Sequence, residues 1–126
     1  MRALLSGIGV AVALLGAISH AHGQKETERF IPIGQSPGVS QKQTSIGEIS
    51  RVDPAARTVT ITEQTGRRTL KITDKTRIWL DRTKLKQANL TGSFADLQKG
   101  RRVEVKYEDP ERRQIADWVK VEITQP

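Results

Sequence analysis

Apolar and polar residues alternate along the chain from about residue 46 onward. Residues 58–62 read TVTIT and residues 69–73 read TLKIT, so every second side chain is apolar. A period of two is typical of a β-strand with one buried face. Runs of the same kind occupy residues 46–52, 76–81, 102–107 and 115–123. The pattern therefore predicts an all-β domain.

Turn-forming residues separate these runs. Asp53 and Pro54 open the first turn, because proline fixes φ and aspartate can bond the backbone behind it. Gly66 supplies the positive φ of the next reversal. The polar stretch 108–113 predicts a hairpin before the last strand. Such short connections favour neighbouring antiparallel strands.

The alternation breaks after residue 81, where helical signals appear. Residues 83–90 space their apolar side chains roughly as a helix does. Ser93 and Gly100 then mark the N-cap and the stop of one helical turn. We expect Phe94 and Leu97 on this turn to plug one end of the core.

Five or six short strands with one short helical plug predict a small, partly open barrel of the OB type. Closing the sheet also protects strand edges, which suits a chain without cysteine. A two-sheet sandwich is the alternative, although about 80 residues is short for that fold.

The first 23 residues have the three-part pattern of a secretory signal peptide. Arg2 provides a positive start, residues 3–18 are almost entirely apolar, and small residues follow. Cleavage after Ala21 or after Gly23 satisfies the small-residue rule. An uncleaved membrane anchor is the rival, but a spanning helix needs about 20 apolar residues. We expect export to the periplasm or beyond.

Residues 24–45 are rich in Gly, Ser, Gln and Pro without a period. Such a composition buries too little apolar surface to fold alone, so it predicts a flexible tether. Its one apolar cluster, Phe30-Ile-Pro-Ile33, is expected to dock on the domain or on a partner. The predicted organisation is thus a signal peptide (1–23), a tether (24–45) and a barrel domain (46–126).

The residues available in the chain disfavour catalysis and leave few candidate ligands for a metal ion. The chain has no cysteine, and its only histidines, His20 and His22, lie at the expected cleavage region. Small exported barrels of this size include copper carriers that use Met and His ligands, but Met1 is the only methionine here. Cleavage after Ala21 would leave His22 at the mature N-terminus, where amine and imidazole chelate copper(II). We predict neither an enzyme nor a resident cofactor.

The formal net charge is +7, and loss of Arg2 with the signal peptide lowers it to +6. A positive net charge favours binding to anionic partners. In an OB-type barrel, basic residues beside stacking aromatics would also suit single-stranded nucleic acid, for which we expect only weak, non-specific binding. The candidate partner-binding residues are Arg77, Trp79, Arg82, Lys84, Lys86, Arg101, Arg102 and Trp118. In the alternative role, Trp79 covers the open edge of the barrel or packs under Lys and Arg stems, and Trp118 pairs across strands with an apolar neighbour.

Three stretches resemble a family of small exported bacterial β-barrel domains of unknown function. They are IGEISRVDPAARTVTI (46–61), ITDKTRI (72–78), and FADLQKGRRVEVKY (94–107) ahead of ADWVKVEI (116–123). The resemblance implies the fold and the compartment, and it implies no catalytic residue. We therefore expect a non-enzymatic binding or accessory module whose basic face meets an anionic envelope protein, polymer or lipid head group. A copper carrier using His22 is the alternative.

Overall fold

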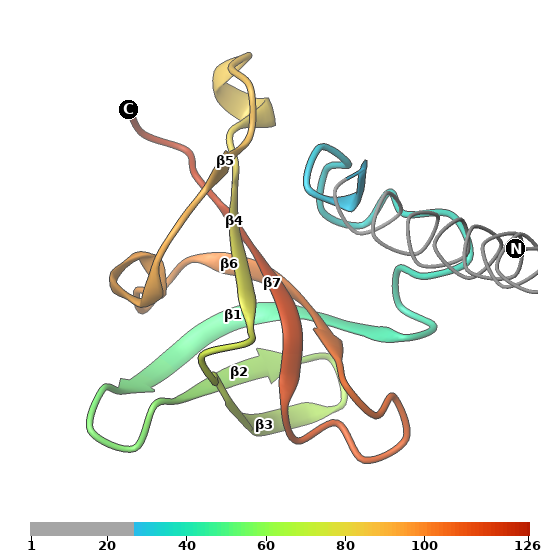
Figure 1. The fold of residues 1–126 in the computed structure, drawn as a ribbon, viewed down its shortest axis with the longest axis vertical. Helices are drawn as coiled ribbons and strands as arrows, with labels where there is room; N and C mark the ends of the chain where they lie inside the picture. The colour runs from blue at the N-terminus through green and yellow to red at the C-terminus, as the bar shows by residue number, and fades with distance from the viewer. Residues whose placement is uncertain (1–26) are drawn as a thin grey trace, which may run out of the picture.

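The computed structural model describes residues 27–126, in which seven strands form one sheet (Figure 1). The strand order in the sheet is β3-β2-β1-β6-β7-β4-β5. The strands are β1 (Thr44–Asp53), β2 (Thr58–Glu63), β3 (Gly66–Lys71), β4 (Arg77–Asp81), β5 (Leu90–Thr91), β6 (Arg102–Tyr107) and β7 (Ala116–Glu122). The all-β class is confirmed, but the sheet has seven strands instead of the expected five or six. The additional one, β5, has only two residues, too few for an alternating pattern to show.

Strand β1 is long enough to pair with two neighbours along different parts of its length. Its first half pairs with β6, and its second half pairs with β2. Strand β4 runs parallel to β7, and an isolated parallel bridge joins Lys71 at the end of β3 to Ile115 ahead of β7. The ring β1-β2-β3-β7-β6-β1 thus closes through that single bridge, which makes a partly open barrel of the OB type.

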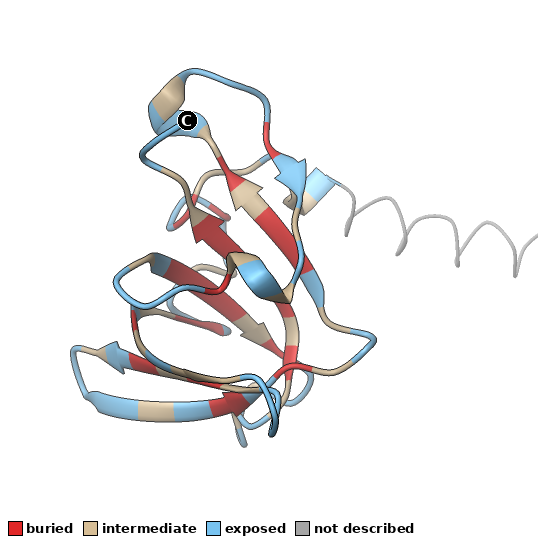
Figure 2. Ribbon diagram, turned by 90° about the vertical axis from the view of Figure 1, so that its left-hand side faces the viewer, coloured by how far each residue is buried: buried red, intermediate tan, exposed pale blue. Residues whose placement is uncertain are grey.

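The inward-facing apolar residues of the alternating runs form the core. Val59 and Ile61 on β2, and Val103 and Val105 on β6, are all at most 3% exposed. Figure 2 shows the buried positions running along the strands. The alternation in the sequence therefore predicts correctly which face of β2 and β6 meets the core.

The helical plug is smaller than the sequence predicts. Residues Phe94–Asp96 form a 3-10 turn (η2), and Thr83–Leu85 form another (η1). Leu97 is buried in the core and Phe94 packs against it, so the plug lies where expected. The backbone N–H of Ser93 donates to Asp96 Oδ2 over 2.8 Å. With so few residues before Gly100, this cap closes a turn rather than an α-helix.

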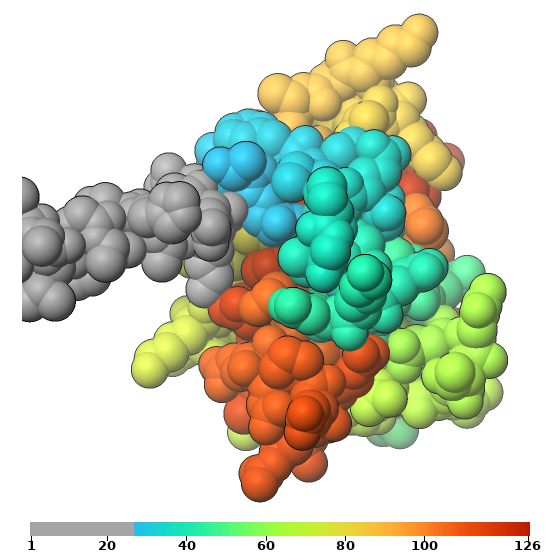
Figure 3. Space-filling view, turned by 90° about the vertical axis from the view of Figure 1, so that its right-hand side faces the viewer, coloured from blue at the N-terminus to red at the C-terminus, as the bar shows by residue number. Residues whose placement is uncertain are grey.

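Residues 27–43, which we name the strap, lie against the outside of the barrel (Figure 3). Ile33 and Ser36 of the strap are buried, and Thr44 and Ser45 already belong to β1. The described part of the expected flexible tether thus lies docked on the barrel; within the apolar cluster Ile33 is buried, whereas Phe30 is exposed. The boundaries at residues 23 and 45 stay predictions.

The expected signal peptide and its cleavage sites lie outside the described residues. Within residues 27–126, no helix has the length and apolar character needed to cross a membrane.

Candidate functional site

Four of the predicted basic residues gather at one end of the barrel, where β4 and β7 end and β6 begins. Lys84 Nζ and Arg102 Nη1 both contact the Glu122 carboxylate at 3.2 Å, one on each oxygen. Arg82 and Lys86 flank Lys84 on the same loop, and Arg82 Nε donates to the Ala88 carbonyl over 2.7 Å. We name Arg82, Lys84, Lys86 and Arg102 the basic patch.

Arg77 and Arg101 lie apart from the basic patch. Arg77 begins β4, so about five residues of extended chain, roughly 16 Å, separate it from Arg82. It lines a different open groove of about 660 Å³ with Arg57 and Lys75. Arg101 is half-buried, and its Nη1 donates to the Asp96 carbonyl over 2.8 Å. The structure therefore divides the eight predicted residues among separate places.

The two tryptophans are covered rather than exposed. Trp79 is 5% exposed and Trp118 is 2% exposed, and their ring centroids lie 5.5 Å apart. The alternation places Trp79 on the outer face of its strand, and there it is buried beside Lys120 and Asp81, which the strap contacts. In this arrangement neither ring is available to stack on a nucleic-acid base, so the stacking part of the predicted site is absent here.

A buried carboxylate joins the strap to β6. Glu104 is fully buried, and its Oε1 accepts from the backbone N–H of Gly34 over 3.0 Å. Its Oε2 accepts from Ser40 Oγ at 2.7 Å and from Thr44 Oγ1 at 2.8 Å. Three donors thus replace the water that this charged group loses on burial.

A buried ammonium group lies beside it on β7. Lys120 is fully buried, and its Nζ donates to Glu28 Oε1 over 2.8 Å and to Ser36 Oγ over 3.2 Å. The same Nζ lies 4.7 Å from the centroid of the Trp118 ring. Ser36 Oγ also donates to Glu28. The strap therefore supplies the carboxylate that balances Lys120.

Asp81 provides a third anchor for the strap. This residue is 5% exposed, and its Oδ2 accepts from the Ile33 backbone N–H over 2.9 Å. Its Oδ1 accepts from the backbone N–H of Thr83 over 3.0 Å, which also fixes the start of the loop that carries Lys84. One oxygen of Asp81 thus binds the strap, and the other binds the first residue of the loop segment that carries Lys84.

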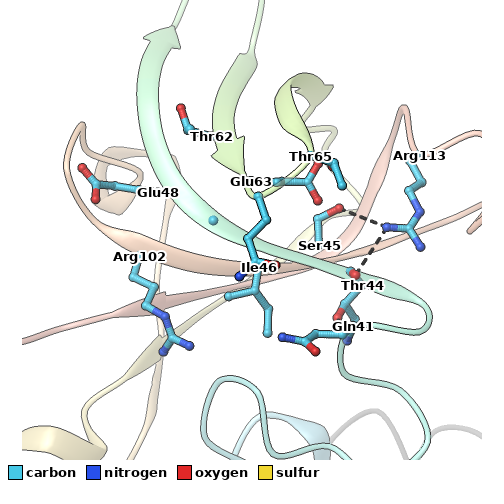
Figure 4. Close-up of a pocket in the computed structure, with 12 residues that line it drawn as sticks. Gln41, Thr44, Ser45, Ile46, Glu48, Thr62, Glu63, Thr65, Arg102 and Arg113 are labelled. Carbon is cyan, nitrogen blue, oxygen red and sulfur yellow. Dashed lines mark hydrogen bonds between the residues drawn. The ribbon is translucent and has the colours of Figure 1, made fainter.

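An open groove of about 700 Å³ runs along the first half of β1, beside the tip of the β2–β3 hairpin (Figure 4). Arg113 lies at one end, where its Nη1 donates to the Thr44 carbonyl and to Ser45 Oγ over 3.4 and 3.3 Å. Arg102 of the basic patch lies at the other end. Glu48 and Glu63 also line the groove, so its charge is mixed.

No group of three or more His, Cys, Asp or Glu residues within residues 27–126 is arranged to hold a metal ion. That range contains no methionine, cysteine or histidine at all. His20 and His22, on which the copper alternative depends, lie outside the described residues.

No known protein family and no curated protein matches this chain. Two solved structures resemble it, both of CusF: a tryptophan-to-alanine variant from Escherichia coli with Cu(II), and an Ag(I) form. The first is 14% identical, with a TM-score of 0.44, and covers 65% of this chain and 95% of that one. The second is 13% identical, with a TM-score of 0.42, and covers 62% and 93%. At TM-scores below 0.5, nothing about the function of this chain follows from the likeness. The resemblance to exported domains stays an expectation.

Sequence reasoning missed the charged layer under the strap. Glu104 and Lys120 alternate with core valines on their strands, so each pattern predicts a solvated outer position. The contacts that bury them come from far away in the sequence: Lys120 and Glu28 are separated by 92 positions. The apolar cluster around Ile33 was the one local signal that this segment docks.

Proposed function

We propose that this chain is an exported, non-enzymatic β-barrel module that binds an anionic partner through the basic patch. The partner is an envelope protein, a polymer or a lipid head group. The signal-peptide pattern of residues 1–23 supports export. The excess of Lys and Arg over Asp and Glu in the domain supports a negatively charged partner.

The arrangement around Glu122 is the observation that carries this proposal. Lys84 and Arg102 share that one carboxylate, and both of its oxygens are already used. The side chains of Lys84 and Arg102 remain 63% and 47% exposed. Arg82 and Lys86 add two further cations for which no ion pair occurs within residues 27–126. The patch therefore keeps a positive excess at the surface, where an anionic partner can reach it.

Burial of acidic residues strengthens this excess. Residues 27–126 contain nineteen Lys and Arg against thirteen Asp and Glu. Asp81 and Glu104 are buried, as is Lys120, so two of the acids but only one of the bases are removed from the surface. The solvent-facing charge is thus more positive than the composition alone indicates.

Cross-linking in the intact envelope tests the proposal. A photo-reactive side chain at Lys86, in the basic patch, should capture a specific partner. The same group at Thr65, on the exposed hairpin tip, is the matched control and should capture none. The reversals Arg82→Glu, Lys84→Glu and Lys86→Glu should abolish the capture by a reporter placed at the neighbouring residue Gln87. Capture that is equal at both positions, or that survives the three reversals, contradicts the proposed role.

Copper(II) carriage is the second candidate function. The sequence observation behind it is His22 at one of two cleavage sites, where it would become the mature N-terminus. Because residues 27–126 supply no thiol, thioether or imidazole, such a site would use the N-terminal amine and imidazole. N-terminal sequencing of the exported protein decides this point. A mature start at Gln24 excludes His22, whereas a start at His22 with copper(II) binding lost in His22→Ala supports carriage.

A further inference from the structure

The outer face of β4, β6 and β7 has the composition of a binding site, although the chain's own strap covers it. We name this surface the strap-covered face. Two tryptophans lie beside one another there, together with charged residues of both signs. Its members are Trp79, Asp81, Glu104, Trp118 and Lys120.

Lys120 makes this face selective for an occupant that supplies a carboxylate at one position. Glu104 and Lys120 are direct neighbours in the β6–β7 register, but no ion pair joins them within residues 27–126. Both oxygens of Glu104 accept hydrogen bonds from strap or β1 donors, and the carboxylate bound to Lys120 is that of Glu28. A buried ammonium without a carboxylate is strongly unfavourable. An occupant whose donors take the oxygens of Glu104, as those of the strap do, must therefore bring its own carboxylate to Lys120.

The strap is held in a way that permits exchange. It forms no strand pairing with the barrel, since the first strand of residues 27–126 begins at Thr44. Ile33 is its only buried apolar side chain, and Phe30 remains 54% exposed. The anchors on Asp81, Glu104 and Lys120 are hydrogen bonds and an ion pair, which water or another polypeptide can replace. Polar interfaces of this kind are typical of reversible association.

We propose that the strap-covered face is a binding site for a turn-forming peptide segment of another protein that carries a glutamate or aspartate, and that the strap, itself a series of turns, is its intramolecular competitor. The strap defines the chemistry of the ligand. A carboxylate takes the position of Glu28 on Lys120, and an apolar side chain five residues later takes the position of Ile33. The two successive backbone N–H groups at that point donate to Asp81 and Glu104. This inference does not depend on the basic patch.

The two tryptophans provide the reporter, because they are the only ones in the chain and they lie beside the strap's anchor: the Trp118 ring contacts Lys120, which binds Glu28, and Trp79 lies against Trp118. The experiment adds a synthetic peptide of residues 27–43 to the full chain and follows tryptophan emission and acrylamide quenching. The matched control peptide carries Gln in place of the glutamate at position 28. We expect the peptide with Glu28 to change the emission at saturation and to bind at least about tenfold more tightly than the control.

A variant of the protein gives a prediction of the opposite sign. Glu28→Gln in the full chain weakens the resident strap and leaves the face intact, so more molecules are competent to bind. The peptide with Glu28 should then bind about tenfold more tightly than to the unaltered protein. Equal affinity for the two peptides would overturn the proposal, and so would an affinity that Glu28→Gln leaves unchanged or reduces. A response to anionic lipid vesicles but to neither peptide would overturn it as well.

Discussion

Glu104 on β6 and Lys120 on β7 face one another across neighbouring strands, yet each is bound by other partners. A cross-strand pair of opposite charge on an uncovered sheet would be expected to bind directly. Here the strap inserts its own donors and its own carboxylate, so the two charges are buried rather than solvated. The docking of the strap therefore depends on these polar contacts as much as on Ile33.

Glu104→Gln tests that dependence. The amide keeps the shape of the side chain but removes the charge that three donors share. Hydrogen bonds to charged groups each contribute about 1.5–3 kcal/mol, so we expect the free energy of unfolding to fall by about 2 kcal/mol. Urea denaturation followed by tryptophan fluorescence measures it. Glu48→Gln, at an exposed position on β1, is the control and should change stability by less than about 0.5 kcal/mol. Equal effects would contradict the structural role of Glu104.

Gly47 precedes Glu48, the residue of β1 that pairs with both β6 and β2, and it leaves no room for a side chain. A Cβ at this residue would lie 2.5 Å from the carbonyl oxygen of Thr62 on β2. Because the obstacle is backbone, we expect Gly47→Ala to destabilise the fold by about 3 kcal/mol. Gly38→Ala is the comparison: it meets no atom within 4 Å and carries only the cost of a φ of +73°, about 1 kcal/mol. Chemical denaturation of both variants checks the difference, and a smaller loss for Gly47→Ala would contradict the close approach.

Tyr107, the only tyrosine of the chain, is fully buried, and this burial raises its pKa above the ordinary value of 10.0. The folded state therefore holds the phenolic proton more tightly than the unfolded state does. It follows that the contribution of Tyr107 to stability is complete below pH 10 and is lost as the pH rises through the folded-state pKa. Ultraviolet absorbance titration should give a midpoint above 10.0. In Tyr107→Phe the decline of stability above pH 10 should be shallower, and an unchanged decline would contradict this assignment.

The strands were predictable because alternation is a local signal and one face of each strand meets the core. Residues 102–107 were predicted as a strand with the observed bounds, and Val103, Val105 and Tyr107 point inward as expected. The helical plug was overestimated, since a cap and a stop residue do not determine how many turns lie between them.

The outer face could not be predicted, because its cover comes from a segment of low apolar content. Trp79 and Trp118 are on the expected side of their strands, but local sequence does not reveal what covers that side. The same holds for the basic patch. Lys84 and Arg102 meet at Glu122 only because β6 and β4 both lie beside β7, which the sequence pattern does not determine.

The salt dependence of binding to an anionic polymer tests the central claim most directly. The full chain is titrated with polyphosphate at several ionic strengths, and Arg82→Glu, Lys84→Glu and Lys86→Glu are combined in one variant. A variant reversing Arg57, Lys75 and Arg77 to Glu is matched in charge and located elsewhere. If the basic patch carries binding, affinity falls steeply with salt, and the patch variant loses much more of it than the matched variant. Affinity that is independent of salt, or equal losses in the two variants, would contradict the account.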